Sequence, residues 1–318
     1  MQFALPPRKN PPLPYAHSPR ISFQRKKQLK AVALLAFAVL SVLFLLSHVF
    51  ASATSSPATG PAGTSSVVIV TVVDREALSD SYIRKIVSNR EDYAKRHGYT
   101  NFIANTTDYT SYLEHAPRSW SIVTGMRHAM ASHPHSTYFF HLDPHALIMN
   151  PSKSLHSHIL EKSELESRML KDVSVVPPDS VVKTFSHLKA SDIDLIISRD
   201  KEDLNPGSFV LRQGDFASFF LDLWFDPLFR AYNFAKAEVH ALDHIVQWHP
   251  TVLARMAVVP QRTLNAYSRD STGAAIDGTY KEGDLVLRFF GCDLDAKRSC
   301  EGEMEPFYNL WKKKVKSD

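Results

Sequence analysis

Hydrophobic runs separated by amphipathic stretches begin at residue 67 and predict strands that alternate with helices. Residues 67–73 are almost all apolar and β-branched, which is typical of a buried strand. A helix is expected next, capped at its start by Ser79 or Asp80 and ending near Gly98. The apolar residues 102–104 then predict a second strand.

The same alternation continues toward the middle of the chain. Apolar positions recur at helical spacing between residues 119 and 133, which predicts a second helix. A strand over residues 138–142 then delivers Asp143 to a turn, and a second apolar run, residues 146–149, follows at once. Strands that alternate with helices predict an α/β fold with a largely parallel sheet.

The second half of the chain has a less regular pattern, with no internal repeat. Its apolar positions predict further strands at residues 194–197, 208–211 and 285–290, and amphipathic helices around residues 216–223, 239–246 and 304–311.

An uncharged apolar run, residues 31–50, follows an amino-terminal segment, residues 1–30, that carries seven basic residues and no acidic one. About 20 apolar residues span a bilayer core, and flanking basic residues keep their end in the cytosol. We therefore expect a single transmembrane signal anchor with the rest of the chain in the lumen. The alternative is a cleaved signal peptide, because residues 51–53, Ala-Ser-Ala, resemble a cleavage site.

Composition separates a stem from a folded domain. Residues 51–66 contain only Ala, Ser, Thr, Pro and Gly, which predicts a flexible stem. Residues 67–318 suffice for one large lumenal domain. The chain carries a formal charge of +4, and because the tail supplies +7 the remainder carries −3. This balance argues against nucleic acid as a ligand of the folded domain.

Two features bear on the compartment. Cys292 and Cys300 are the only cysteines, eight residues apart. In an oxidising lumen they could close a short loop as a disulfide; the alternative is a pair of free thiols. Asn105 opens the one N-glycosylation sequon, and its glycosylation would fit a lumenal domain.

Residues 141–151, His-Leu-Asp-Pro-His-Ala-Leu-Ile-Met-Asn-Pro, carry the strongest chemical signal. An aspartate presented at the carboxyl end of a strand is how α/β sheets build nucleotide and metal sites. Asp143 is therefore a candidate functional residue. Asn205 is expected in a turn before Gly207, where turn chemistry alone accounts for it. Glu238 and Asp243 lie five residues apart, so a helix turns them partly away from each other and one of the two could face a cleft.

Several motifs occur in order across the predicted lumenal domain and resemble the pattern of glycosyltransferase family 34. They are Asn89-Arg-Glu-Asp-Tyr-Ala, Arg118-Ser-Trp120, Arg127-His128-Ala129, Leu142-Asp143, Leu204-Asn-Pro-Gly-Ser-Phe209 and Phe289-Phe-Gly-Cys292. That family holds fungal α-1,6-mannosyltransferase subunits, yeast α-1,2-galactosyltransferases and plant xyloglucan xylosyltransferases. The chain looks most similar to the α-1,6-mannosyltransferase subunits of the fungal Golgi mannan polymerase II complex.

The resemblance implies a GT-A (Rossmann-like) fold, GDP-mannose as donor, Mn²⁺ as cofactor and transfer with retention at the anomeric carbon. It also implies a Golgi type II membrane protein with sister mannosyltransferase subunits as partners and the mannan of N-linked glycans as acceptor. The implied site residues are Asp143, His145, Arg127 and Arg288 for the donor, and Asn205 and Glu238 for catalysis.

Four positions depart from the family pattern. His145 replaces the second carboxylate of an Asp-x-Asp metal motif, and Arg288 replaces a histidine that resembles a third metal ligand. A family lysine is Ile122 here, and a family glutamine is Val239. Asp143 and His145 remain the candidate metal ligands, whereas Arg288 would repel Mn²⁺ and attract a diphosphate.

These departures leave more than one function open. A leaving diphosphate needs positive charge, which a metal or a fixed guanidinium such as that of Arg288 can supply. The main hypothesis is a Golgi α-1,6-mannosyltransferase that elongates mannan as a subunit of a polymerase complex. The alternatives are a non-catalytic scaffold subunit, in which Arg288 makes only an ion pair, and a related α-galactosyltransferase.

Overall fold

The computed structural model describes residues 30, 32, 34–41, 65–269 and 278–317. The chain divides into two units, Met1–Ala58 and Thr59–Asp318, and the second carries every element named below. Most of the predicted basic tail (1–30), membrane segment (31–50) and stem (51–66) lies outside the described residues. Among those that are described, no helix has the length and apolar character needed to cross a membrane.

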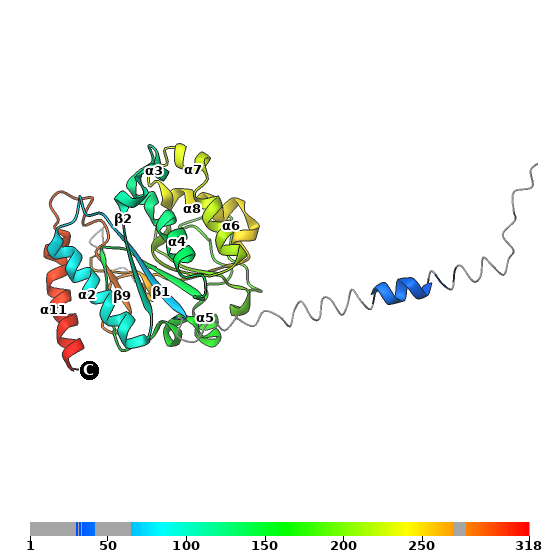
Figure 1. The fold of residues 1–318 in the computed structure, drawn as a ribbon, viewed down its shortest axis with the longest axis horizontal. Coiled ribbons are helices and arrows are strands. Elements are labelled where there is room, and N and C mark those ends of the chain that lie inside the picture. The colour runs from blue at the N-terminus through cyan, green and yellow to red at the C-terminus, as the bar shows by residue number, and fades with distance from the viewer. Residues whose placement is uncertain (1–29, 31, 33, 42–64, 270–277, 318) are drawn as a thin grey trace, which may run out of the picture. The chain divides into compact units, whose positions relative to one another are not determined.

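The second unit is a mixed α/β fold built on a six-stranded sheet of order β2-β1-β3-β6-β5-β7 (Figure 1). Its strands are β1 (Val67–Val73), β2 (Thr100–Asn105), β3 (Tyr138–Leu142), β5 (Leu195–Arg199), β6 (Leu204–Arg212) and β7 (Met256–Pro260). β1 pairs in parallel with β2 and β3, and β5 with β7. β6 runs antiparallel to both β3 and β5, so the prediction of a largely parallel sheet is wrong for this strand.

A second, three-stranded sheet has the order β4-β9-β8. It consists of β4 (Ala146–Ile148), β8 (Ala266–Tyr267) and β9 (Val286–Arg288). The α-helices of this unit are α2 (Asp80–His97), α3 (Thr110–Leu113), α4 (Ser121–Ser132), α5 (Lys162–Arg168), α6 (Asp215–Trp224), α7 (Pro227–Ala231), α8 (Glu238–Trp248), α9 (Pro250–Leu253), α10 (Gln261–Leu264) and α11 (Cys300–Ser317). Shorter helical turns are η1 (Thr106–Tyr109), η2 (Arg118–Trp120), η3 (His156–Leu160) and η4 (Ala190–Asp192).

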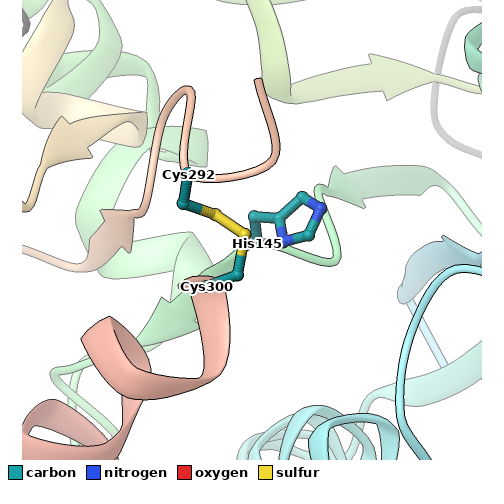
Figure 2. Close-up of side chains that lie close together, drawn as sticks. All are labelled: His145, Cys292 and Cys300. Carbon is teal, nitrogen blue, oxygen red and sulfur yellow. A yellow bond between two sulfur atoms is a disulfide. The ribbon is translucent and has the colours of Figure 1, made fainter. Parts of the chain in front are cut away.

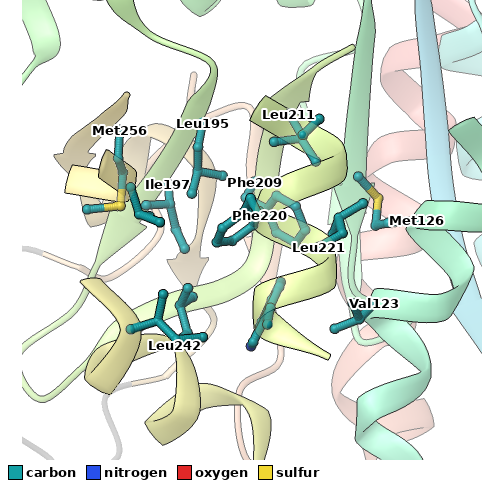
Figure 3. Close-up of a cluster of buried hydrophobic side chains, with 14 of the residues drawn as sticks. Val123, Met126, Leu195, Ile197, Phe209, Leu211, Phe220, Leu221, Leu242 and Met256 are labelled. Atoms are coloured by element: carbon teal, nitrogen blue, oxygen red, sulfur yellow. The ribbon is translucent and has the colours of Figure 1, made fainter. Parts of the chain in front are cut away.

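Alternating side chains of the strands fill two cores, one on each face of the large sheet. Val68 and Val70 of β1 join the core formed with α4, α6 and α8. Val67 and Ile69 pack on the opposite face, with residues of α2, α5 and the small sheet. Figure 3 shows the first core, where Phe209 of β6 lies among side chains of α4, α6 and α8.

Helix α2 has the caps that the sequence predicts. The Ser79 side chain accepts a hydrogen bond from the Tyr82 N–H, and Gly98 ends the helix in a left-handed conformation with φ 67°. The carboxyl-terminal helix α11 lies beside α2 (Figure 1) and packs with it and the small sheet around a third apolar cluster. Ion pairs from Lys85 of α2 to Glu301 and Glu305 of α11 join the two helices.

Candidate active site

A cleft of about 780 Å³ opens along the edge of the large sheet where β1 and β3 end. Because β6 is antiparallel, its first residues reach the same edge as the last residues of β3. The cleft is lined by Asp143, His145, Asn205, Glu238 and Arg288, together with residues of α2, η2 and the segment after β9. Five of the six residues expected in the site therefore share one cavity.

The turn of residues 143–145 is fixed between the two sheets. The Asp143 N–H donates to the Gly207 carbonyl at 2.7 Å, and the Phe289 N–H donates to the His145 carbonyl at 2.7 Å. Within the turn, the His145 N–H donates to Asp143 Oδ1 at 2.6 Å, which sets the direction of the carboxylate. Backbone bonds on both sides thus hold Asp143 at the cleft wall.

Two buried polar residues of α2 support this turn, although the sequence analysis assigns no role to either. The Arg90 guanidinium donates to the Asp143 carbonyl at 2.9 Å and to Asn89 Oδ1 at 3.0 Å. The Asn89 side chain in turn exchanges two hydrogen bonds with the backbone of Ile148 in β4. A fully buried arginine is rare unless its donors are used. The adjacent Asn and Arg of the first family motif are therefore internal supports of the site.

Arg288 points from the end of β9 across the cleft wall. Its Nη2 donates to Asp143 Oδ2 at 2.7 Å and its Nη1 donates to Asn205 Oδ1 at 2.7 Å. The guanidinium lies 5.3 Å from the ring centre of Phe290. A Cβ atom at Gly207 would come within 2.4 Å of the guanidinium carbon, so a side chain here would displace the guanidinium from this position.

Asn205 lies within β6 rather than in the expected turn, because the strand begins four residues earlier than its apolar run. It is 2% exposed. Its side-chain oxygen accepts from Arg288 and from the Gly207 N–H, and its amide donates to the Tyr267 hydroxyl. Both the oxygen and the nitrogen of the Asn205 side-chain amide therefore make hydrogen bonds within the protein. The bond from Arg288 to this oxygen holds the guanidinium in its position.

Glu238 begins α8 and faces the cleft, where the Ser119 hydroxyl donates a hydrogen bond to its carboxylate. Burial raises the pKa of Glu238, and the bond from Ser119 opposes this rise. Asp243, one turn farther along α8, does not line the cleft. It accepts the Leu204 N–H at 3.0 Å, and its burial raises its pKa well above the usual range of an aspartate.

Arg127 is the exception among the expected donor-binding residues. It lies on α4, half-exposed, and its guanidinium pairs with Asp222 of α6. It does not line the cleft, so its expected role in donor binding is not supported by its position. Helical periodicity predicts the helix around Arg127, but it does not predict which face of that helix lies toward the cleft. Ile122 and Val239, the apolar residues at two family polar positions, do line the cleft.

His145 lies beside the disulfide that the structure forms between Cys292 and Cys300 (Figure 2). A hydrogen bond of 3.0 Å joins its Nδ1 to the hydroxyl of buried Tyr82. The imidazole and both sulfur atoms lie within 4.8 Å of one another. Because the sulfur atoms are bonded to each other, they are not thiolate ligands, and this group is a packed wall of the cleft rather than a metal site.

The described residues that line this cleft do not fit the divalent cation that the resemblance implies. Both carboxylate oxygens of Asp143 already accept hydrogen bonds, one of them from the Arg288 guanidinium. A hard cation such as Mn²⁺ needs several oxygen ligands and no adjacent positive charge. The other cluster of potential ligands, Asp203, His240 and Asp243, includes a carboxylate that pairs with the Lys236 ammonium.

Charge at the cleft wall is fixed by these contacts. Burial would raise the pKa of Asp143, but Arg288 and His145 hold it at about 2, so the carboxylate stays ionised. Burial lowers the pKa of the neighbouring His141 to about 3, which keeps this imidazole neutral. The pair of Asp143 and Arg288 is therefore charged throughout the physiological range.

Residues 63–300 match the model of the galactosyl transferase GMA12/MNN10 family. The chain belongs to this family. The matched segment contains β1 to β9 and every residue that lines the cleft except Glu301.

Relatives within the family carry two kinds of name. A Schizosaccharomyces pombe protein named an uncharacterized alpha-1,2-galactosyltransferase is 31% identical over 80% of this chain and 77% of its own length. A Saccharomyces cerevisiae protein named probable alpha-1,6-mannosyltransferase MNN11 is 32% identical over 78% of this chain and 62% of its own length. A Schizosaccharomyces pombe alpha-1,2-galactosyltransferase is 31% identical over 67% of this chain and 56% of its own length.

Among solved structures, a glycosyltransferase involved in the glycosylation of the major capsid of PBCV-1 aligns with a TM-score of 0.47 and 16% identity, over 76% of this chain and 98% of that one. At the level of the family, the chain is a hexosyltransferase of the galactosyl- and mannosyltransferase group.

Proposed function

We propose that the protein transfers a hexose from a nucleoside diphosphate sugar to a glycan. The observation that carries this proposal is the meeting of Asp143, Arg288 and Glu238 in one cleft, although they lie far apart in the sequence. The cleft supplies a cation for a phosphate group and a carboxyl group for a sugar hydroxyl. Its volume of about 780 Å³ is within the range of pockets that enclose a small ligand.

The positions of these groups suggest how the reaction proceeds. The donor diphosphate is expected at Arg288, whose guanidinium stabilises the charge that develops as the bond to the sugar breaks. Glu238, held by Ser119, is placed to accept the proton of an acceptor hydroxyl. Attack from the face that the leaving group vacates gives retention at the anomeric carbon.

Our more specific proposal is α-1,6-mannosyl transfer from GDP-mannose to the mannan of N-linked glycans. It is supported by the motifs of the family and by the mannosyltransferase names among the relatives. Other relatives bear the name of α-1,2-galactosyltransferases, which makes a UDP-galactose donor the specific alternative. We further propose a type II Golgi membrane protein that acts with sister subunits.

A donor panel tests the transfer. The full-length chain is incubated with GDP-mannose or UDP-galactose and an α-mannoside acceptor, with Mn²⁺ and with EDTA in parallel. Mass spectrometry should find the acceptor extended by one hexose with GDP-mannose. If the acceptor is extended with UDP-galactose and not with GDP-mannose, the protein is a galactosyltransferase rather than a mannosyltransferase. The absence of product with every donor, from a folded protein that binds no nucleotide, would leave the scaffold function instead.

A further inference from the structure

We infer that Arg288 takes the place of a divalent cation, so that the cleft binds the diphosphate of its donor without metal. The inference rests on the proposed function, because it concerns the same donor. The side chain that carries it is Arg288, which bonds to Asp143 and Asn205 in the cleft wall.

The guanidinium occupies the position at which a cation would meet Asp143. It is 2.7 Å from Asp143 Oδ2 and 2.7 Å from Asn205 Oδ1, which are the kinds of oxygen atoms that coordinate Mg²⁺, Mn²⁺ or Ca²⁺ in proteins. The other Asp143 oxygen is turned toward the His145 N–H. A carboxylate and an amide oxygen thus hold a fixed organic cation where they could have held a metal ion.

The surrounding residues are shaped for the guanidinium. Gly207 leaves the space that the guanidinium fills, since even a Cβ atom there would collide with it. The ring centre of Phe290 lies 5.3 Å from the guanidinium carbon, and this ring stacks on Tyr267. The Arg288 side chain is 17% exposed and borders the cleft. It is therefore an anchored group that still reaches the solvent of the cavity.

Arg288 also retains unused donors. Each Nη atom carries two N–H groups, and the bonds to Asn205 and Asp143 use one on each. A phosphate oxygen is an acceptor that arginine binds through paired N–H groups. Acidic residues such as Asp74, Asp200 and Asp293 also line the cleft, so an anionic donor needs a fixed positive charge of this kind.

Calorimetric titration of the full-length chain with GDP and with UDP tests the inference. Each titration is run once in EDTA and once with MnCl₂. The wild type should bind one of the nucleotides with dissociation constants that agree within about threefold in the two conditions. The Arg288→Ala variant should bind roughly 10- to 100-fold more weakly, the loss typical of a charged hydrogen bond. Arg288→Lys should recover only part of the affinity, because lysine lacks the planar fork.

Controls separate binding from folding. Arg262 makes a two-bonded pair with Asp284 outside the cleft, so Arg262→Ala removes a comparable ion pair and should leave nucleotide affinity unchanged. If Arg288→Ala does not fold, Arg288→Gln with Asp143→Asn provides a neutral pair of similar shape, and it should show the same loss. Arg288→His with His145→Asp creates an imidazole and two carboxylates, and its nucleotide binding should become dependent on Mn²⁺.

The outcomes distinguish this inference from the proposed function. Nucleotide binding by the wild type only with MnCl₂ overturns the inference and leaves the proposed transfer intact. An unchanged affinity of the folded Arg288 variants also overturns it. A wild type that binds neither nucleotide in either condition overturns both. Equal binding in EDTA and MnCl₂, lost in Arg288→Ala and kept in Arg262→Ala, establishes the metal-independent site.

Discussion

The carboxyl group of Glu238 is subject to two opposing influences on its pKa. Burial raises it and the hydrogen bond from Ser119 lowers it. If Glu238 accepts a proton from the acceptor hydroxyl, transfer requires its ionised form and falls as the pH drops through this pKa. Substitution of Ser119 and of Glu238 therefore tests the role of Glu238 through the pH profile, which a loss of activity alone would not do.

Ser119→Ala should raise the pKa of Glu238, because it removes the bond that stabilises the carboxylate. The acid limb of the pH profile of kcat should then move to higher pH, while activity on the alkaline side is retained. Glu238→Gln should reduce kcat by about 10²- to 10⁴-fold with nucleotide affinity unchanged. A Glu238→Gln protein with the wild-type pH profile and kcat would remove Glu238 from the mechanism.

At the residue scale, the sequence predicted which side chains line the cleft better than which contacts they make. Asp143 was placed correctly because it ends an apolar run, and strand ends meet at the sheet edge. Asn205 was expected in a turn, yet it is a buried member of β6 that holds Arg288. Arg127 faces away from the cleft because the facing of a helix depends on packing that periodicity alone does not give.

At the scale of elements, capping signals were the most reliable. The termini of α2 follow directly from Ser79 and Gly98. The reversed direction of β6 was missed, since β-branched and apolar residues favour a strand without giving its direction. The observed strands leave only residues 200–203 between β5 and β6, and so short a connection fits an antiparallel pair. The predicted strands, residues 194–197 and 208–211, leave ten residues between them, so the short connection that indicates an antiparallel pair could not be recognised.

Gly98 provides a test of the α2 terminus. Its φ of 67° strains residues that carry a Cβ atom, and no atom lies within 4 Å of the position such a Cβ would take. Gly98→Ala should therefore destabilise the fold by about 1 kcal/mol through backbone strain alone. Gly98→Asn should cost less, because asparagine tolerates this conformation better. Urea unfolding measures both, and equal stability of all three proteins would contradict the argument.

His158 links two elements and should make stability depend on pH. Its Nε2 lies 2.7 Å from the Thr263 carbonyl, joining η3 to α10, and burial lowers its pKa from 6.5 to about 4. Between these values the unfolded chain binds the proton and the folded chain does not, so stability falls as the pH is lowered. By pH 4.5 this residue should cost about 2–3 kcal/mol relative to pH 7.

His158→Gln is the matching control, because glutamine can still donate to the Thr263 carbonyl but does not titrate. Urea unfolding at pH 4.5 and 7 should show a smaller difference between the two pH values for this variant than for the wild type. Identical pH dependence in the two proteins would show that His158 is protonated equally in the folded and unfolded states.

At the scale of the whole molecule, topology remains a prediction of the sequence. Asn105 ends β2 at the surface, and its side-chain amide donates to the hydroxyl of Thr107, the third residue of the sequon. We expect the chain, made in a fungal host, to carry a glycan at Asn105 and to stay in the membrane fraction after carbonate extraction. Endoglycosidase should increase its electrophoretic mobility, and Asn105→Gln should abolish that change. An unchanged mobility together with release by carbonate would contradict a lumenal domain on a membrane anchor.

The bridge between Cys292 and Cys300 ties the cleft to the chemistry of the compartment in which the chain folds. In a reducing cytosol the same wall would present two thiols beside His145, a ligand set that suits zinc. Protein produced in the cytoplasm of a bacterium would then differ from secreted protein at this wall of the cleft, with an identical sequence. The choice of expression host therefore decides whether an assay measures the disulfide-bonded or the reduced form of the cleft. The thiol and zinc content of a preparation shows which of these forms it contains.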